Sequence, residues 1–359
     1  MKILSIIIPF GLSKERAYIQ DRIIQKAKEF KNNEKIDYIF VEGYSSLENN
    51  LKQIIEDNGH IYIKDESQKE YFSQGKCRNL GAVFANSKVL MFLDADCYIS
   101  NFSLERILNL IQIKNIVQNI NEILVLPVVY LSKNGSDYIY NQEQILWDDI
   151  IKDDLISGKK KNISFFSFVS SSIVINKYKF LELGGNNDEY IGHSYEDFDF
   201  LARLLFSTTE FEKMPRAICY DEGNWNLASF KGFRAWFSLL GYEMSFHGIY
   251  IYHFFHEEPN QNNYMSNRRK NHKKFYKNLA NLKNYKIKSL LSNNELYNYG
   301  LNFDKRYISI NSLIYDRYLY EIKNTKLKFL DIFNFFIMKF SHTKLYRILK
   351  KTNKKLNNT

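Results

Sequence analysis

The chain of 359 residues has few cysteines and prolines and lacks long apolar runs. The three cysteines, Cys77, Cys97 and Cys219, are isolated and odd in number. This pattern excludes a disulfide framework and a paired zinc site, and it indicates a reducing compartment. Four prolines and fifteen glycines exclude a collagen-like or linker-dominated chain. The hydrophobic fraction of 45% is enough for a sizeable core, so general disorder is excluded as well.

The sequence also shows neither the pattern of a signal peptide nor that of a transmembrane helix. The N-terminal apolar run is short, is interrupted by Pro9 and has no small-residue cleavage site. No segment reaches the roughly eighteen uninterrupted apolar residues that a spanning helix needs. We therefore expect a cytoplasmic protein without a transmembrane helix.

Charge is distributed very unevenly along the chain, whose formal net charge is +10. Residues 264–359 carry 22 basic and 5 acidic side chains, a net +17, whereas residues 1–263 carry 28 basic and 35 acidic side chains, a net −7. Length and charge together predict two domains: a working domain over 1–263 and a basic, helical region over 264–359. The basic region indicates an anionic partner. Charge alone leaves nucleic acid and an anionic membrane surface open.

Short β-rich runs alternate with helical stretches in the first hundred residues. The predicted strands cover residues 4–8, 38–41, 61–63 and 89–93, and the predicted helices cover 14–30 and 75–85. This alternation predicts an α/β fold with a mostly parallel sheet and helices on its faces. Ligands of such sheets bind beyond the carboxyl ends of the strands.

The pattern continues less regularly beyond residue 100. Further strands are predicted at residues 123–129, 167–175, 214–220 and 248–255, and a helix at 195–206. Residues 221–246 are rich in Trp and Phe, and we expect them to form a substrate-facing insertion rather than a periodic element. From residue 264 the composition is mainly helical.

Asp94-Ala95-Asp96 directly follows an apolar predicted strand. In an extended chain the two carboxylates point to the same side, because side chains alternate with period two. Such a pair at a strand's carboxyl end suits Mg²⁺ or Mn²⁺ carrying a diphosphate. The tripeptide also arises by chance, and Asp197-Phe198-Asp199 is a second copy. The position after the strand is what favours Asp94 and Asp96.

Two further clusters contain groups that can do chemistry. Glu196 and Asp197 open a predicted helix, where an ionised carboxylate can act as a general base, or where both can simply stabilise the first turn. His253 and His256 follow an apolar run, and a neutral imidazole can complete a coordination sphere that a carboxylate starts. The alternative is a satisfied strand-end histidine followed by a loop histidine.

Lys76 and Arg78 lie where a helix is predicted to begin. Two cations at such a position can hold a phosphate or a substrate hydroxyl. A solvated helix start explains them equally well.

Taken in order, these motifs resemble the family 2 inverting glycosyltransferases, which use nucleotide sugars and have the GT-A fold. The resemblance covers roughly residues 3–262, and its elements are Ser5-Ile-Ile-Ile-Pro9 with Arg16, Val41-Glu42-Gly43, Lys76-Cys-Arg-Asn-Leu-Gly81, Asp94-Ala-Asp96, the Gly184-Gly185 to Asp197 block and His256-Glu-Glu-Pro-Asn260. The last element is similar to the galactosyltransferase-like branch and to bacterial capsule and chondroitin-type enzymes. The fold implied is a mixed sheet with flanking helices.

The resemblance implies a role for each motif. Asp96 would be the carboxylate ligand of Mn²⁺ or Mg²⁺, and Asp94 would contact the ribose or the metal. His256 would be the second protein ligand, with His253 as the competing assignment. Asp197 would be the catalytic base, with Glu196 holding the acceptor. The substrate-binding set would be Pro9, Glu42, Lys76, Arg78, Asn79, Asp94 and Gly185.

The sequence departs from the family pattern in two places. Glu42-Gly43-Tyr44 replaces the usual Asp-Asp-Gly, which weakens the implied contact with uracil. Residues 207–245 are longer and more aromatic than is usual between the base and the histidine, and we expect them to be the acceptor-specific element.

The end of the basic region has its own pattern. Residues 327–351 combine dense aromatics with flanking Lys and Arg, which suits an interfacial helix on anionic lipid. The alternative is that residues 329–340 pack on the catalytic domain and leave only a solvated basic tail. The composition also permits binding of single-stranded nucleic acid, but no nucleic-acid module is recognisable, so we expect none to bind.

The function expected from these motifs is metal-dependent, inverting transfer of a sugar from a UDP-sugar to a bacterial surface polysaccharide, such as a capsule. Galactose and N-acetylgalactosamine are slightly favoured as the sugar. The acceptor would be a glycan or a lipid-linked glycan, and residues 327–355 would hold the enzyme at the inner face of the membrane. A non-catalytic glycan- or membrane-binding assembly factor is the alternative. A phosphohydrolase ranks last, because it needs a larger ligand cluster for two metals.

Overall fold

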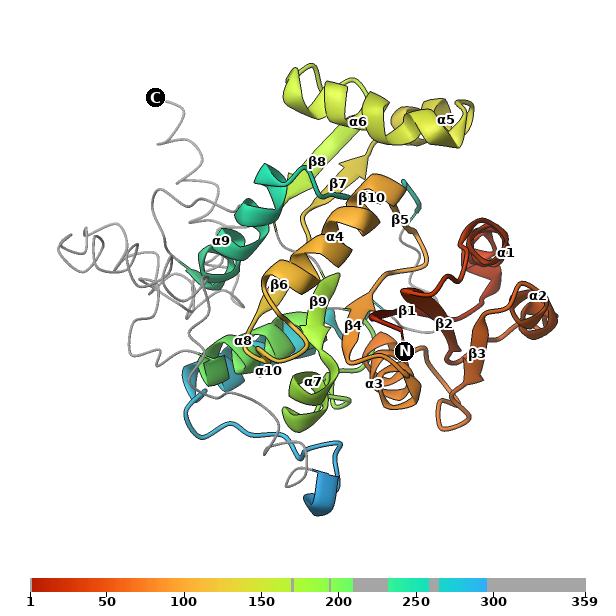
Figure 1. Ribbon diagram of the computed structural model, residues 1–359. Coiled ribbons are helices and arrows are strands. Elements are labelled where there is room, and N and C mark those ends of the chain that lie inside the picture. Colours follow the sequence, from red (N-terminus) through yellow and green to blue (C-terminus); the bar gives the residue numbers. More distant parts are fainter. Residues whose placement is uncertain (1, 169–170, 194, 209–231, 258–264, 296–359) are drawn as a thin grey trace, which may run out of the picture.

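The computed structural model of the protein describes residues 2–168, 171–193, 195–208, 232–257 and 265–295 (Figure 1). The strand predicted at 214–220 and the aromatic tail at 327–355 lie outside these residues. Within the described part, no helix is both long enough and apolar enough to cross a membrane.

A six-stranded sheet forms the centre of the fold, with the order β3-β2-β1-β4-β9-β6. Its strands are β1 (Leu4–Phe10), β2 (Ile36–Glu42), β3 (Ile61–Lys64), β4 (Val89–Phe92), β6 (Ile123–Val125) and β9 (Ile173–Asn176). The first four strands run parallel, and β9 is antiparallel to both of its neighbours. Every residue of β1 and β2 is buried, because helices cover both faces of a parallel sheet. The predicted α/β fold is confirmed, and so are the strands predicted at residues 4–8, 38–41, 61–63 and 89–93.

The helices divide between the two faces of this sheet (Figure 1). Ile6 and Ile8 of β1 face a core that includes side chains of α1 and α4, whereas Ile7 faces the core that includes α3, α7, α8, α9 and α10. The helices are α1 (Tyr18–Glu29), α2 (Leu51–Asp57), α3 (Gln74–Phe84), α4 (Asn101–Ile113), α5 (Lys133–Tyr140), α6 (Trp147–Ile156), α7 (Lys177–Glu182), α8 (Glu196–Thr208), α9 (Gly232–Phe246) and α10 (Arg268–Ala280), with 3-10 turns at Lys14–Arg16 and Gln144–Leu146.

A second, four-stranded sheet has the order β5-β10-β7-β8. It contains β5 (Cys97–Ile99), β7 (Val128–Leu131), β8 (Ile163–Ser167) and β10 (Ile251–His253). The single strand predicted at 123–129 is wrong: β6 and β7 belong to different sheets, and Pro127, which has no N–H to donate to a ladder, lies between them. The strand predicted at 167–175 is wrong in the same way, since it contains the end of β8 and the start of β9.

Residues 232–246 differ from the prediction of a non-periodic insertion. They form α9, and Phe233, Phe237, Leu240 and Met244 are buried at helical spacing. This part of the proposed acceptor element is therefore largely a core helix, although Arg234 reaches the cavity described below. Helix α10 opens the basic region and packs on α8. The division at residues 263 and 264 stays a prediction.

Candidate active site

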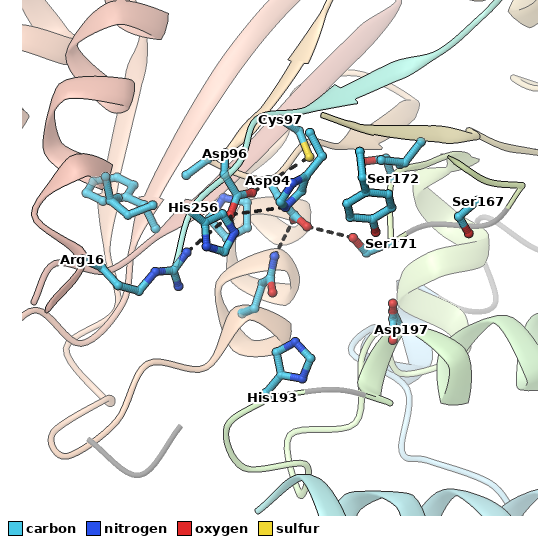
Figure 2. A pocket seen from close by; sticks show the side chains of 18 of the residues that line it. Arg16, Asp94, Asp96, Cys97, Ser167, Ser171, Ser172, His193, Asp197 and His256 are labelled. Atoms are coloured by element: carbon cyan, nitrogen blue, oxygen red, sulfur yellow. Dashed lines mark hydrogen bonds and ion pairs between the residues drawn. The ribbon is translucent and has the colours of Figure 1, made fainter. Parts of the chain in front are cut away.

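A cavity of about 770 Å³ lies beyond the carboxyl ends of β1 and β4, beside the second sheet. Side chains from both sheets and from the start of α8 line it (Figure 2). It contains seven of the residues that the sequence indicated, namely Pro9, Asp94, Asp96, Glu196, Asp197, His253 and His256. The fold therefore brings the predicted metal ligands and the predicted base to one place.

Asp94 is held by three neighbouring side chains. Its Oδ1 accepts hydrogen bonds from Arg78, whose Nη2 lies 2.7 Å away, and from Gln74. Its Oδ2 accepts from the Ser171 hydroxyl at 2.9 Å. Both oxygens already have protein donors, so this carboxylate is fixed in orientation.

Asp96 faces the two histidines instead. Its Oδ2 lies 2.9 Å from Nε2 of His256 and 3.7 Å from Nε2 of His253, and Arg16 approaches the same oxygen at 3.4 Å. Burial raises the pKa of Asp96, but His253, His256 and Arg16 together lower it well below its usual range. Burial lowers the pKa of His253, so its neutral, ligand-competent form is favoured.

The pairing of β5 with β10 explains why both histidines reach Asp96. The antiparallel register places His253 opposite Cys97, and the Phe254 N–H donates to the Asp96 carbonyl at 3.2 Å. β10 ends at His253, and the chain then turns so that His256 returns to the same carboxylate. The sequence left the two histidines as alternatives, and the structure brings them together.

One carboxylate and two imidazoles fit a divalent metal ion. The ligand atoms of Asp96, His253 and His256 all lie within 4.8 Å of one another. Ligands about 2.1 Å from an octahedral ion lie about 3 Å apart, close to the spacings of 2.9 and 3.7 Å around Asp96 Oδ2. Small movements would therefore admit an ion.

Glu196 and Asp197 form a second carboxylate pair at the first turn of α8. Burial, with a contribution from Asp197, raises the pKa of Glu196 to about 8, and Arg78 opposes the rise. Burial also raises the pKa of Asp197, which is half-buried at the cavity wall, against the effects of Arg78 and of the Phe198 N–H that bonds its Oδ1. Two adjacent carboxyls of this kind resist being ionised together. Because the charge of Asp197 helps to raise the pKa of Glu196, Asp197 is the carboxyl that ionises first and Glu196 is the one that keeps its proton at neutral pH.

Arg78 lies outside the cavity lining and connects Asp94 to the carboxyl pair at the start of α8. Its side chain is 1% exposed; Nη2 pairs with Asp94, and Nη1 lies 3.7 Å from Glu196 Oε1. The sequence suggested that Arg78 binds substrate. Its burial indicates instead that it acts through these two carboxylates.

Asn79 and Gly185 fix the loop before α8 and are not among the cavity-lining residues. The side chain of Asn79 exchanges two 2.8 Å hydrogen bonds with the backbone of Asn186. Gly185 has φ +59, and a Cβ there would collide with the Asn79 amide oxygen. Both residues position the loop that leads to Glu196, and neither of them lines the site.

Glu42 and Lys76 also lie away from the cavity lining. Glu42 is buried at the end of β2 and accepts hydrogen bonds from Tyr62 and Asn49, beside a separate hollow of about 420 Å³. Lys76 is half-buried in the first turn of α3. Their substrate-binding roles stay predictions.

The structure adds residues that the motifs did not single out. Gln74 and Ser171 hold Asp94, and His193 lines the cavity near Asp197 (Figure 2). Arg16, which the resemblance included without a role, pairs with Asp96. Ser171 and Asp94 are 77 positions apart in the sequence, and Arg16 and Asp96 are 80 apart. Contacts between residues so far apart in the sequence cannot be predicted from helix or strand periodicity.

A strand-end carboxylate pair, an Asp–His–His set that could hold a divalent metal ion and a helix-initial carboxylate pair surround one cavity. Residues 5–281 match the model of the glycosyltransferase-like family 2. Since the match covers more than half of the chain, the chain belongs to this family. No curated protein matches it.

Several solved structures are similar to part of this chain. TarS of S. aureus is 16% identical, with a TM-score of 0.37 over 57% of this chain and 33% of that one. A shorter TarS chain in complex with UDP is 18% identical, with a TM-score of 0.37 over 57% and 55%. Glucosyl-3-phosphoglycerate synthase from Mycobacterium tuberculosis, in complex with Mn²⁺, UDP and glucosyl-3-phosphoglycerate, is 10% identical, with a TM-score of 0.34 over 57% and 66%. This chain thus spans a third to about two-thirds of these proteins, and the family assignment rests on the family model.

Proposed function

We propose that the protein transfers a sugar from a UDP-sugar to a hydroxyl of a growing bacterial surface polysaccharide, with inversion at the anomeric carbon and with help from a divalent metal. One observation carries the proposal. The Asp197 carboxylate and the Asp96–His253–His256 set line the same cavity from separate elements (Figure 2). A base and a diphosphate-binding centre in one cavity are what direct displacement requires.

The carboxylates at the start of α8 supply the proton chemistry. An acceptor hydroxyl is a poor nucleophile until a base removes its proton, and a positioned base contributes roughly 10²–10⁴ in rate. Asp197 takes this role because it lines the cavity and ionises before its neighbour Glu196. Glu196, protonated beside it, donates a hydrogen bond that holds the acceptor. Direct attack opposite the leaving group inverts the anomeric carbon and needs no protein nucleophile.

Asp96, His253 and His256 would hold the metal, which when bound stabilises the negative charge that develops on the departing diphosphate. Carboxylates suit both Mg²⁺ and Mn²⁺, whereas imidazoles suit the transition metals better. The donor set therefore favours Mn²⁺ over Mg²⁺. Asp94, held by Arg78, would accept hydrogen bonds from the ribose of the donor, and Pro9 would flank the nucleotide.

The finer identity of the substrates rests on the resemblance to capsule and chondroitin-type enzymes. Galactose or N-acetylgalactosamine is the preferred sugar, and a capsular glycan or its lipid-linked precursor is the preferred acceptor. A cytoplasmic location at the inner face of the membrane follows from the same proposal. Helix α10 supports an anionic partner, since Lys270, Lys273 and Lys277 are exposed on one side of it.

The test is UDP release from a panel of UDP-sugars, with Mn²⁺, with Mg²⁺ and with chelator, in the absence and presence of glycan acceptors. Release from one donor that requires metal supports the transferase and identifies its sugar. Absence of both UDP release and UDP binding across the panel contradicts the proposal and favours a binding factor that retains the fold without turnover.

A further inference from the structure

One aromatic residue outside the cavity wall stacks on a proposed metal ligand. The ring of Tyr18, in the first turn of α1, lies 5.4 Å from the imidazole of His256, centroid to centroid, with an interplanar angle of 19°. Offset stacking of this kind restricts rotation of the imidazole about χ2. Nothing in the proposed chemistry uses the phenol itself.

Arg22 also contacts the Tyr18 ring. Its guanidinium lies 4.7 Å from the centre of the Tyr18 ring, and its Nη2 donates to the carbonyl of Phe255 at 3.0 Å. Tyr18 and Arg22 are four residues apart, so they lie on the same side of α1. One row of a helix thus contacts both the side chain of His256 and the backbone just before it.

The second nitrogen of the imidazole also has a partner. His256 Nδ1 lies 2.9 Å from the carbonyl of Glu257, so it acts as the donor of that bond. This leaves Nε2, which faces Asp96 Oδ2 at 2.9 Å, as the nitrogen that can ligate a metal. Both the ring orientation and the ligating nitrogen are therefore fixed before an ion binds.

We propose that Tyr18 and Arg22 are positioning residues that hold His256 in its metal-binding orientation, so that helix α1 sets the affinity of the metal centre. This inference rests on the proposed metal site. Without the stack, the imidazole would have to be ordered by the ion itself, and that cost would weaken binding. Outer partners of metal ligands typically contribute about 10- to 100-fold in affinity.

The experiment is a titration of the full-length protein with Mn²⁺, in which electron paramagnetic resonance measures the free ion. Tyr18→Leu removes the ring, and we expect affinity to fall about 10- to 100-fold. Tyr18→Phe keeps the ring but removes the hydroxyl that accepts from Arg16 Nε, so affinity should stay within about threefold of the parent. Tyr138→Leu, at an exposed tyrosine of α5, is the matched control and should not change affinity.

A double-mutant cycle separates positioning from a general structural effect. If Tyr18 acts through His256, then Tyr18→Leu should weaken Mn²⁺ binding little further once His256 is replaced by Ala. Arg22→Gln should reproduce part of the loss, and it keeps the proposal testable if Tyr18→Leu does not fold. Thermal melting identifies variants that have lost the fold.

The outcomes separate the inference from the function on which it rests. Parental affinity in folded Tyr18→Leu, or fully additive losses in the cycle, overturns the positioning role and leaves the metal site intact. If the parent protein itself shows no saturable Mn²⁺ binding, the proposed metal centre fails, and the positioning role fails with it.

Discussion

Arg78 and Asp94 form a short ion pair, with Nη2 2.7 Å from Oδ1, and the arginine is almost fully buried. The pair joins the strand-end carboxylate to the carboxyls of α8, because the same guanidinium approaches Glu196. A buried cation with two acidic neighbours thus links the carboxylate that follows β4 to the carboxyls at the start of α8.

Replacing Arg78 with Met should therefore be costly. Removing one partner of a buried pair leaves uncompensated charge, which typically costs about 3–5 kcal/mol. We expect the free energy of unfolding, measured with urea, to fall by about that amount. The exposed Arg106→Met on α4 is the control. A loss below about 1 kcal/mol for Arg78→Met contradicts the linking role.

Asp197→Asn should reduce the turnover number at least 100-fold, since the general-base contribution lies in that range. UDP binding should be nearly unchanged, because the metal ligands come from other elements. Kinetics and UDP titration measure the two effects separately. Asp188→Asn, at an exposed position in the preceding loop, is the matched control. Near-normal turnover in Asp197→Asn rules out this base.

The raised pKa of Glu196 predicts the direction of a pH effect on stability. Its pKa is about 8 in the folded protein, above the ordinary value of 4.5, so the folded state binds more protons than the unfolded state. Stability from this group is then fully present below about pH 4.5 and is lost as the pH rises toward 8. Glu196→Gln should remove this loss, which is on the order of 3–4 kcal/mol between pH 5 and 8. If the free energy of unfolding changes with pH in the same way in the parent and in Glu196→Gln, the raised pKa of Glu196 is contradicted.

Asp94 and Asp96 should respond differently to loss of charge. Asp96 faces both histidines, whereas both oxygens of Asp94 already accept protein hydrogen bonds. We expect Asp96→Asn to weaken Mn²⁺ binding at least tenfold and Asp94→Asn to weaken it less. Calorimetric titration compares them directly. A larger loss of affinity in Asp94→Asn than in Asp96→Asn would indicate that the metal binds at Asp94 rather than beside the histidines.

Gly185→Ala should destabilise the loop before α8. Gly158 has a similar positive φ but open space where a Cβ would lie, so Gly158→Ala isolates the backbone strain, about 1–2 kcal/mol. Gly185→Ala adds the collision with Asn79 and should cost about 1 kcal/mol or more beyond the control. Equal losses in thermal or urea unfolding would mean that the loop shifts to avoid Asn79.

The sequence predicted the parts of this protein that depend on local patterns. The buried runs of β1, β2 and β4 and the carboxylates after β4 follow from composition and period two, and the structure contains them. The helical spacing of Phe233, Phe237, Leu240 and Met244 was also present, but the many other aromatics around it obscured it. Local patterns thus identify elements well where one period dominates.

Non-local features were not predictable in the same way. Residues three apart in a strand point to opposite faces, so a period-two pattern could not show that His253 and His256 converge. Only the end of β10 at His253 allows it. The change of sheet at Pro127 depends likewise on which strand is the neighbour, and that information is not contained in the segment itself.

The pairing of β5 with β10 has a consequence for how the protein is made. Asp96 emerges from the ribosome more than 150 residues before its histidine partners do. The parallel strands β1 to β4 can associate during synthesis, but the proposed metal site also needs the pairing of β5 with β10, which can form only after residue 253 has been made. Metal binding would therefore report that a newly synthesised chain has completed its catalytic domain.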